Sequence, residues 1–210
     1  MHDILTIAYE SCEWLVSFLP FLIIWTMYCR KGRKQDDVFS WYRNILLVVF
    51  ALYIIGVFYV TGAGTLYDAI GLRVEYIAEH INLVPFSQRI DVKGYVLNII
   101  LLMPFGFLLP MIWDDMRKPI PVILSGFAFS LLIEVSQILS SRGTDIDDLI
   151  LNTLGAALGF SCYRAWDRIT KSKFQSNGKA VMTLPVSLIV LFLSRFLLLY
   201  RMGLIRLFYG

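Results

Sequence analysis

The chain has 210 residues, of which 58% are hydrophobic and only 17% charged, with a net charge of +3 and a mean hydropathy of +0.67. Soluble domains are about 45–50% apolar and about 25% charged, so the composition predicts an integral membrane protein and no nucleic-acid partner. A spanning helix needs roughly 20 apolar residues. The length therefore allows about six spans in an all-α polytopic helix bundle, with residues 1–210 as a single transmembrane domain.

Six apolar segments are the expected spans. They cover about 5–29, 44–62, 95–113, 120–140, 148–166 and 182–200. The start of the chain lacks the basic region of a secretory signal, so the first segment is expected to be retained as a span. The three cysteines show no metal-binding spacing.

Basic residues concentrate in the first, third and fifth connections, which hold twelve of the nineteen Lys and Arg. Cytoplasmic loops are enriched in these residues, so both termini are predicted to lie outside the membrane. The loop 63–94 and the short segment "SSRGTDID" are then outside as well. Apolar residues at helical spacing in that loop predict a surface helix at about 66–81, followed by "NLVPF" at 82–86.

Polar residues inside the spans gather at one depth, in the outer half of the bilayer. Ser130, Glu134, Gln137 and Ser141 form one stripe of the fourth span. Asp148, Asn152, Gly155 and Gly159 share a face of the fifth span, and Asn98 lies near the outer end of the third. Pro104 and Gly106 are expected to interrupt the third span. The cost of burying a charge in a membrane predicts that Glu134 pairs with Arg142, or is protonated and hydrogen-bonded to Asn98 or Asn152.

Each of these residues also has a purely structural interpretation. Asp145, or Thr144 before it, is a good N-cap, and acids in the first helical turn favour the helix dipole. Asp145 with Asp148 resembles a capping box. The Gly155/Gly159 pair forms a GxxxG motif, which is typical of close helix packing, and Asn152 and Gln137 could join helices instead of binding a ligand.

The motifs taken together identify a family. "NLVPF" (82–86), "LNIILLMPFGFLLP" (97–110), "IEVSQ" (133–137) and "RGTDIDDLILNTLGAALGF" (142–160) occur in this order, and the region from about 45 to 165 resembles the VanZ-like family of bacterial membrane proteins. The resemblance implies a multi-pass protein of the bacterial cytoplasmic membrane with a role in low-level teicoplanin resistance that leaves the D-Ala-D-Ala target unchanged. The residues marked by the family pattern are Asn82, Pro85, Phe86, Asn98, Pro104, Phe105, Gly106, Glu134, Gln137, Arg142, Asp145, Asp147, Asp148, Asn152, Gly155 and Gly159.

Three functions fit this pattern. In the first, an outward-facing polar pocket binds a cell-envelope lipid, a lipid-linked cell-wall precursor or the glycopeptide antibiotic; Arg142 would hold a phosphate or carboxylate through its bidentate fork. In the second, an intramembrane enzyme modifies a lipid-linked precursor with Glu134 as general acid or base. The third is a transporter or assembly factor. No cofactor is expected, although Asp145, Asp147 and Asp148 offer the hard oxygen ligands of a divalent cation.

Overall fold

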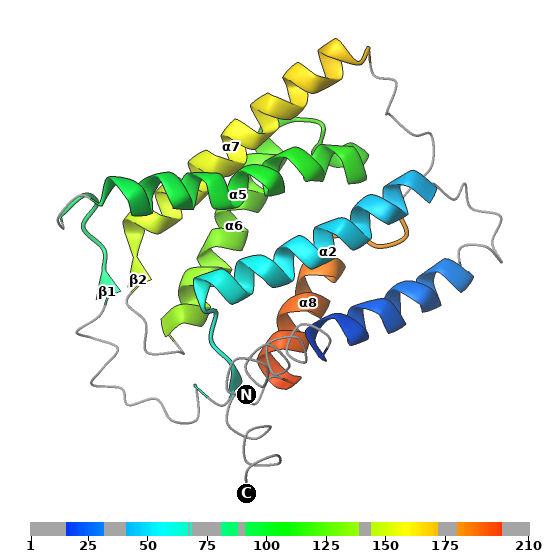
Figure 1. The fold of residues 1–210 in the computed structure, drawn as a ribbon, viewed down its shortest axis with the longest axis horizontal. Coiled ribbons are helices and arrows are strands. Elements are labelled where there is room, and N and C mark those ends of the chain that lie inside the picture. Colours follow the sequence, from blue (N-terminus) through cyan, green and yellow to red (C-terminus); the bar gives the residue numbers. More distant parts are fainter. Residues whose placement is uncertain are drawn as a thin grey trace, which may run out of the picture.

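The protein is a bundle of helices, shown in Figure 1 as a computed structural model that describes residues 16–31, 41–66, 68, 81–87, 91–138, 144–171 and 180–198. A first helix covers 16–31. The elements that follow are α2 (Trp41–Thr61), β1 (Ile81–Asn82), α5 (Val92–Ile112), the 3-10 turn η1 (Asp114–Met116), α6 (Pro119–Ile138), β2 (Thr144–Asp145), α7 (Ile146–Ile169) and α8 (Leu184–Leu198). The all-α bundle expected from the sequence is confirmed. Residues 1–15 and almost all of the expected surface helix at 66–81 lie outside the described residues.

Three of the described helices, α2, α5 and α6, are long and apolar enough to cross a membrane. Their outer faces carry exposed aliphatic side chains, such as Leu52 on α2, Ile100 on α5 and Leu124 on α6. Large apolar residues in such numbers on the outside of a bundle are stable in lipid and not in water. The chain is therefore a membrane protein.

Helices α5 and α7 form the most extensive helix contact of the bundle, and glycines make it close. A Cβ atom at Gly106 would lie 1.9 Å from the Ala156 carbonyl oxygen, and one at Gly159 would lie 2.0 Å from that of Met103. At Gly155 the distance to the Ile99 carbonyl oxygen would be 2.2 Å. The two backbones thus touch along several turns, as small residues permit in membrane helices.

The expected interruption of the third span is wrong, because α5 continues as one helix through both Pro104 and Pro110. Proline removes one backbone hydrogen bond and leaves a carbonyl four residues earlier without its partner. The Tyr53 hydroxyl of α2 donates to the Leu101 carbonyl in this turn, at 2.6 Å. This bond is to the carbonyl next to that of Ile100, whose usual donor Pro104 lacks, so a neighbouring helix contacts the backbone in the turn that the proline weakens.

Aromatic rings fill the core between α2, α5 and α6. Phe105 stacks on Phe129 with ring centroids 4.9 Å apart, and its other neighbour is Phe50, at 5.8 Å. Phe58 meets Phe129 edge to face. Phe105 is fully buried, so this family-pattern residue has a packing role.

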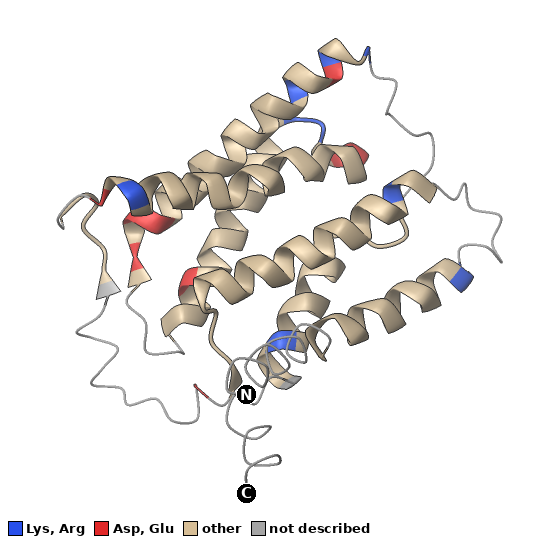
Figure 2. Ribbon diagram, in the orientation of Figure 1, with Lys and Arg blue, Asp and Glu red and all other residues tan. Residues whose placement is uncertain are grey.

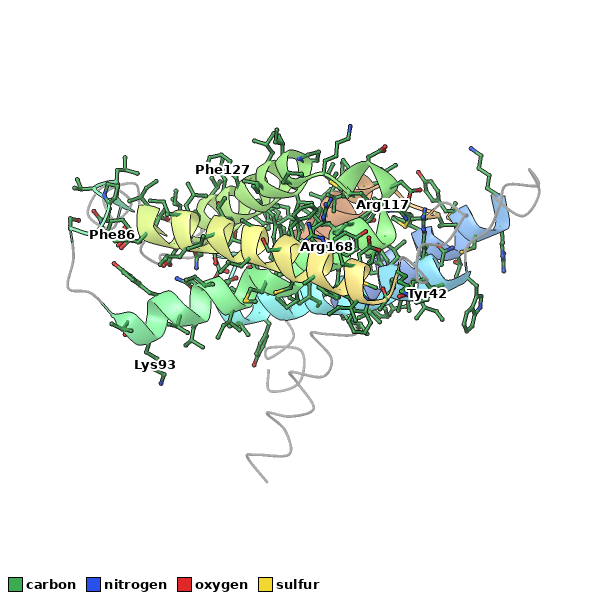
Figure 3. The ribbon with its side chains drawn as sticks, turned by 90° about the horizontal axis from the view of Figure 1, so that it is seen from above. Tyr42, Phe86, Lys93, Arg117, Phe127 and Arg168 are labelled. Atoms are coloured by element: carbon green, nitrogen blue, oxygen red, sulfur yellow. The ribbon has the colours of Figure 1, made fainter. Side chains whose placement is uncertain are left out.

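Most basic positions of the described helices lie at one end of the bundle in Figure 2, together with some acidic ones, and we call it the basic end; the opposite end carries both acidic and basic positions. At the basic end Arg43, only 2% exposed, forms a bidentate ion pair with Asp114, with both N–O distances 2.7 Å. Arg117 pairs with the same carboxylate. Seen from above in Figure 3, Tyr42, Arg117 and Arg168 lie toward this end, and Phe86 and Lys93 lie at the opposite end. The start of α2, the turn η1 and the end of α7 therefore share one end of the molecule.

Candidate functional site

Four carboxylates from two helices meet at the end of the bundle opposite the basic end, and we call them the acid cluster: Glu134, Asp145, Asp147 and Asp148. Glu134 comes from the last turns of α6, and the three aspartates begin α7. A short parallel β1–β2 pair, in register Asn82 with Asp145, ties the segment 81–87 to the start of α7. The structure therefore brings the "NLVPF" motif next to the aspartates at the start of α7, more than sixty residues after Asn82 in the sequence.

Asp145 caps α7, as its sequence predicted, since its carboxylate accepts the Asp147 backbone N–H at 3.0 Å. The same carboxylate accepts the Asn82 amide at 3.2 and 3.3 Å. The expected capping box with Asp148 does not form. The Asp145 backbone N–H instead donates to the Glu134 carboxylate at 3.2 Å, so a residue of a different helix takes the reciprocal role.

Asp147 holds the turn at 84–87 in place. Its carboxylate accepts the Phe86 backbone N–H at 2.8 Å and the Tyr95 hydroxyl at 2.5 Å. The Ser87 N–H closes the turn on the Val84 carbonyl, and Phe86 has a φ of +54°. Proline followed by a positive φ is the type II pattern, and this backbone costs a non-glycine residue on the order of 1–3 kcal/mol. The contacts of Asp147, which is 2% exposed, therefore maintain a strained turn.

Asp148 accepts a hydrogen bond from the Asn98 amide of α5. Sequence reasoning identified Asn98 but missed Tyr95, which binds the neighbouring aspartate. The spacing of three residues between them puts both on one face of α5, and that spacing was the available signal. These two residues make the described side-chain hydrogen bonds between α5 and the cluster.

One turn deeper, Asn152 of α7 donates to the Ser130 hydroxyl of α6 at 3.1 Å. Its side-chain oxygen is buried and has no hydrogen-bond partner among the described residues. The expected bond from Asn98 or Asn152 to Glu134 is not formed, because Asp148 and Ser130 take these amides. Asn152 is 2% exposed and Glu134 4%, so both polar groups are enclosed between the helices.

Two predicted binding residues lie apart from these contacts or outside the described part of the chain. Gln137 donates from Nε2 to the Thr61 carbonyl, at 2.9 Å, and thereby joins α6 to the end of α2. Arg142 lies outside the described residues. The stripe predicted for α6 is thus divided between two neighbours, because Ser130 and Glu134 bond to the segment of α7 and its cap, and Gln137 bonds to the end of α2.

No Lys or Arg among the described residues forms an ion pair with the acid cluster. The two ion pairs of the described chain are at the basic end, and no three His, Cys, Asp or Glu side chains in the described ranges are arranged to hold a metal ion. Each aspartate instead has its own protein donors. The larger cavity found, of about 430 Å³, lies between helix 16–31 and α2, away from the cluster.

Comparison with known proteins was consistent with the motifs. The family described as VanZ/LLP1 matches residues 44–169. Protein VanZ of Enterococcus faecium is 30% identical over 131 residues, which cover 60% of this chain and 74% of that protein. No solved structure is significantly similar.

Proposed function

Because the chain belongs to the VanZ/LLP1 family, we propose that it binds the headgroup of a cell-envelope lipid or lipid-linked precursor at the acid cluster and lowers susceptibility to teicoplanin-type glycopeptides. The cluster would face the outside of the bacterial cytoplasmic membrane, with the basic end in the cytoplasm. The observation that carries the proposal is the concentration, at one end of a membrane bundle, of four carboxylates that form no ion pair with a described Lys or Arg. Charges in such places are costly and usually serve a ligand or a pathway.

The orientation follows from the distribution of charge. Arg43, Arg117 and Arg168 belong to the basic end, and Lys and Arg are retained on the cytoplasmic side. In the proposed orientation the acid cluster would lie near the outer surface, which is where a lipid-anchored glycopeptide meets its target. A protein that occupies or covers the precursor headgroup there would reduce access of the drug without altering the target.

Arg142 is the proposed contact for the ligand. It stands three residues before Asp145 in the sequence, and a guanidinium matches a phosphate or carboxylate through two parallel hydrogen bonds. The acid cluster would supply the counter-charge that orients Arg142. In this arrangement Asn152, whose buried side-chain oxygen lacks a partner, is a polar position available to a donor of the ligand or to water.

The test is teicoplanin susceptibility of a Gram-positive host that expresses the protein, with membrane levels of each variant matched by immunoblot. We expect wild type to raise the inhibitory concentration and Arg142→Ala to abolish the effect. Glu134→Gln keeps the shape and the acceptor oxygen toward the Asp145 N–H, so it should retain much of the effect. Asp115→Asn is the matched control, because it removes an exposed acid at the other end of the bundle.

The outcomes separate the alternatives. Loss of resistance in Glu134→Gln at normal membrane levels would indicate proton transfer by this residue and therefore an enzyme. Full activity of Arg142→Ala would refute the proposed headgroup contact. A wild-type protein that leaves susceptibility unchanged would refute the role in resistance.

A further inference from the structure

A groove between helix 16–31 and α2 lies away from the acid cluster. Its volume of about 430 Å³ falls in the range of about 300–1,000 Å³ that is usual for small-molecule sites. The groove is open on one side, and its walls are mostly apolar. The residues on which the inference rests are Trp25, Arg30, Trp41, Ile45, Val48 and Val49.

Two donors in this groove have no protein acceptor among the described residues. The Trp25 Nε1 atom is buried and makes no hydrogen bond. Arg30 is exposed and forms neither of the ion pairs of the described chain. An indole N–H without a partner costs free energy when it is buried, and a guanidinium binds anionic oxygens best. The chemistry of this end of the groove therefore fits an anionic oxygen group.

The rest of the groove fits a hydrocarbon chain. Ile45, Val48 and Val49 follow one another along α2, and Ile45 and Val49 are 41% and 46% exposed. Helix α2 is one of the three that can cross a membrane, so these side chains face lipid. From Trp41 to Val49 the helix rises about 12 Å, which places the aliphatic wall deeper in the bilayer than the arginine end.

Tryptophan marks the level at which the headgroup would lie. Trp41, at the start of α2, is 72% exposed, and tryptophan is enriched at the membrane–water interface. Arg30 ends the neighbouring helix in the same groove. Figure 2 shows basic residues at the adjoining ends of these two helices. A water-soluble anion could use the donors but would gain nothing from the aliphatic wall.

We propose that this groove is a binding site for one anionic glycerophospholipid, with its phosphate at Arg30 and the Trp25 indole N–H and an acyl chain along Val48 and Val49. The site is separate from the acid cluster and does not depend on the function proposed for it. It would hold a lipid of the leaflet at the basic end of the bundle. The preference should be for negative headgroups over zwitterionic ones of the same chain length.

Native mass spectrometry of the delipidated full-length protein tests this, with phosphatidylglycerol and phosphatidylcholine of identical acyl chains as probes. Glycerol phosphate, in a third arm, tests the headgroup alone. We expect wild type to bind phosphatidylglycerol about tenfold more tightly than phosphatidylcholine, as one charge-assisted contact provides, and glycerol phosphate to bind far more weakly.

Arg30→Gln should abolish the preference, and Trp25→Phe, which removes the N–H donor, should reduce it. Arg30 is exposed, and Trp25→Phe keeps an aromatic ring against the core, so neither variant should unfold the protein. Arg168→Gln, which removes an exposed charge at the same end of the bundle, is the control and should keep the preference. Equal affinity of wild type for the two lipids, or an equal loss in Arg30→Gln and Arg168→Gln, would overturn the proposal.

Discussion

The close contact between α5 and α7 makes Gly155 the position at which one methyl group should disturb both fold and site. A Cβ atom there would lie 2.2 Å from the Ile99 carbonyl oxygen, whereas real Cβ contacts are essentially never shorter than 3.0 Å. Gly155→Ala must therefore move the helices apart by at least 0.8 Å, the difference between these two distances. The obstacle is backbone, which cannot rotate away as a side chain can.

The expected cost is about 3 kcal/mol, at the upper end of the range of about 1–3 kcal/mol for overpacked cores. Unfolding of the detergent-solubilised protein by increasing SDS, followed by circular dichroism, measures it. Ile99 adjoins Asn98, whose amide binds Asp148. The same substitution should therefore weaken the acid cluster and, under the proposed function, lower teicoplanin resistance at matched membrane levels.

Gly94→Ala is the matched control on the same helix pair. Its new Cβ would meet only the Asp91 carboxylate, at 2.8 Å, which is the end of a flexible side chain. Alanine is favoured over glycine in helices by about 0.5–1 kcal/mol, so this variant should be neutral or slightly stabilised. If Gly155→Ala unfolds at the same SDS fraction as wild type, the backbone contact between α5 and α7 is not as close as described here.

Two further predictions concern polar contacts at the two ends of the bundle. A double-mutant cycle of Tyr95→Phe and Asp147→Ala should give a coupling energy of about 1.5–3 kcal/mol in the same unfolding assay, as for hydrogen bonds to charged groups; additive effects would show that the two side chains do not interact. Asp114→Ala should destabilise the protein by about 2–3 kcal/mol, because it leaves the buried Arg43 guanidinium without its carboxylate. This loss of stability is smaller than the roughly 3–5 kcal/mol expected when one partner of a fully buried ion pair is removed, because the Asp114 side chain is 50% exposed. Asp115→Ala, next to it and exposed, should change stability by less than about 0.5 kcal/mol, and an equal loss in both variants would contradict the ion-pair explanation.

The composition and the hydrophobic runs were sufficient to predict a bundle of membrane helices, because burial in lipid requires long apolar segments whatever their neighbours are. The Asp145 cap was equally predictable, since a cap depends on residues within one turn. The positions of polar residues within apolar segments also indicated which residues would form the acid cluster. These inferences need only the order of residues along a helix.

Contacts between segments distant in sequence were decided by the tertiary structure. The sequence could not show that Glu134 completes the cap of α7, that Asp147 pins the turn before α5, or that Gln137 contacts α2 and not the acid cluster. Each of these contacts depends on which helix faces meet. One amide or carboxylate could bond equally well to several other polar groups, so its chemistry alone does not select the partner. Pro104 shows the same limit, because the sequence could not show that the helix continues through it or that Tyr53 of α2 bonds to the backbone in that turn. Packing selects one partner among many compatible ones, and that selection is a property of the whole fold.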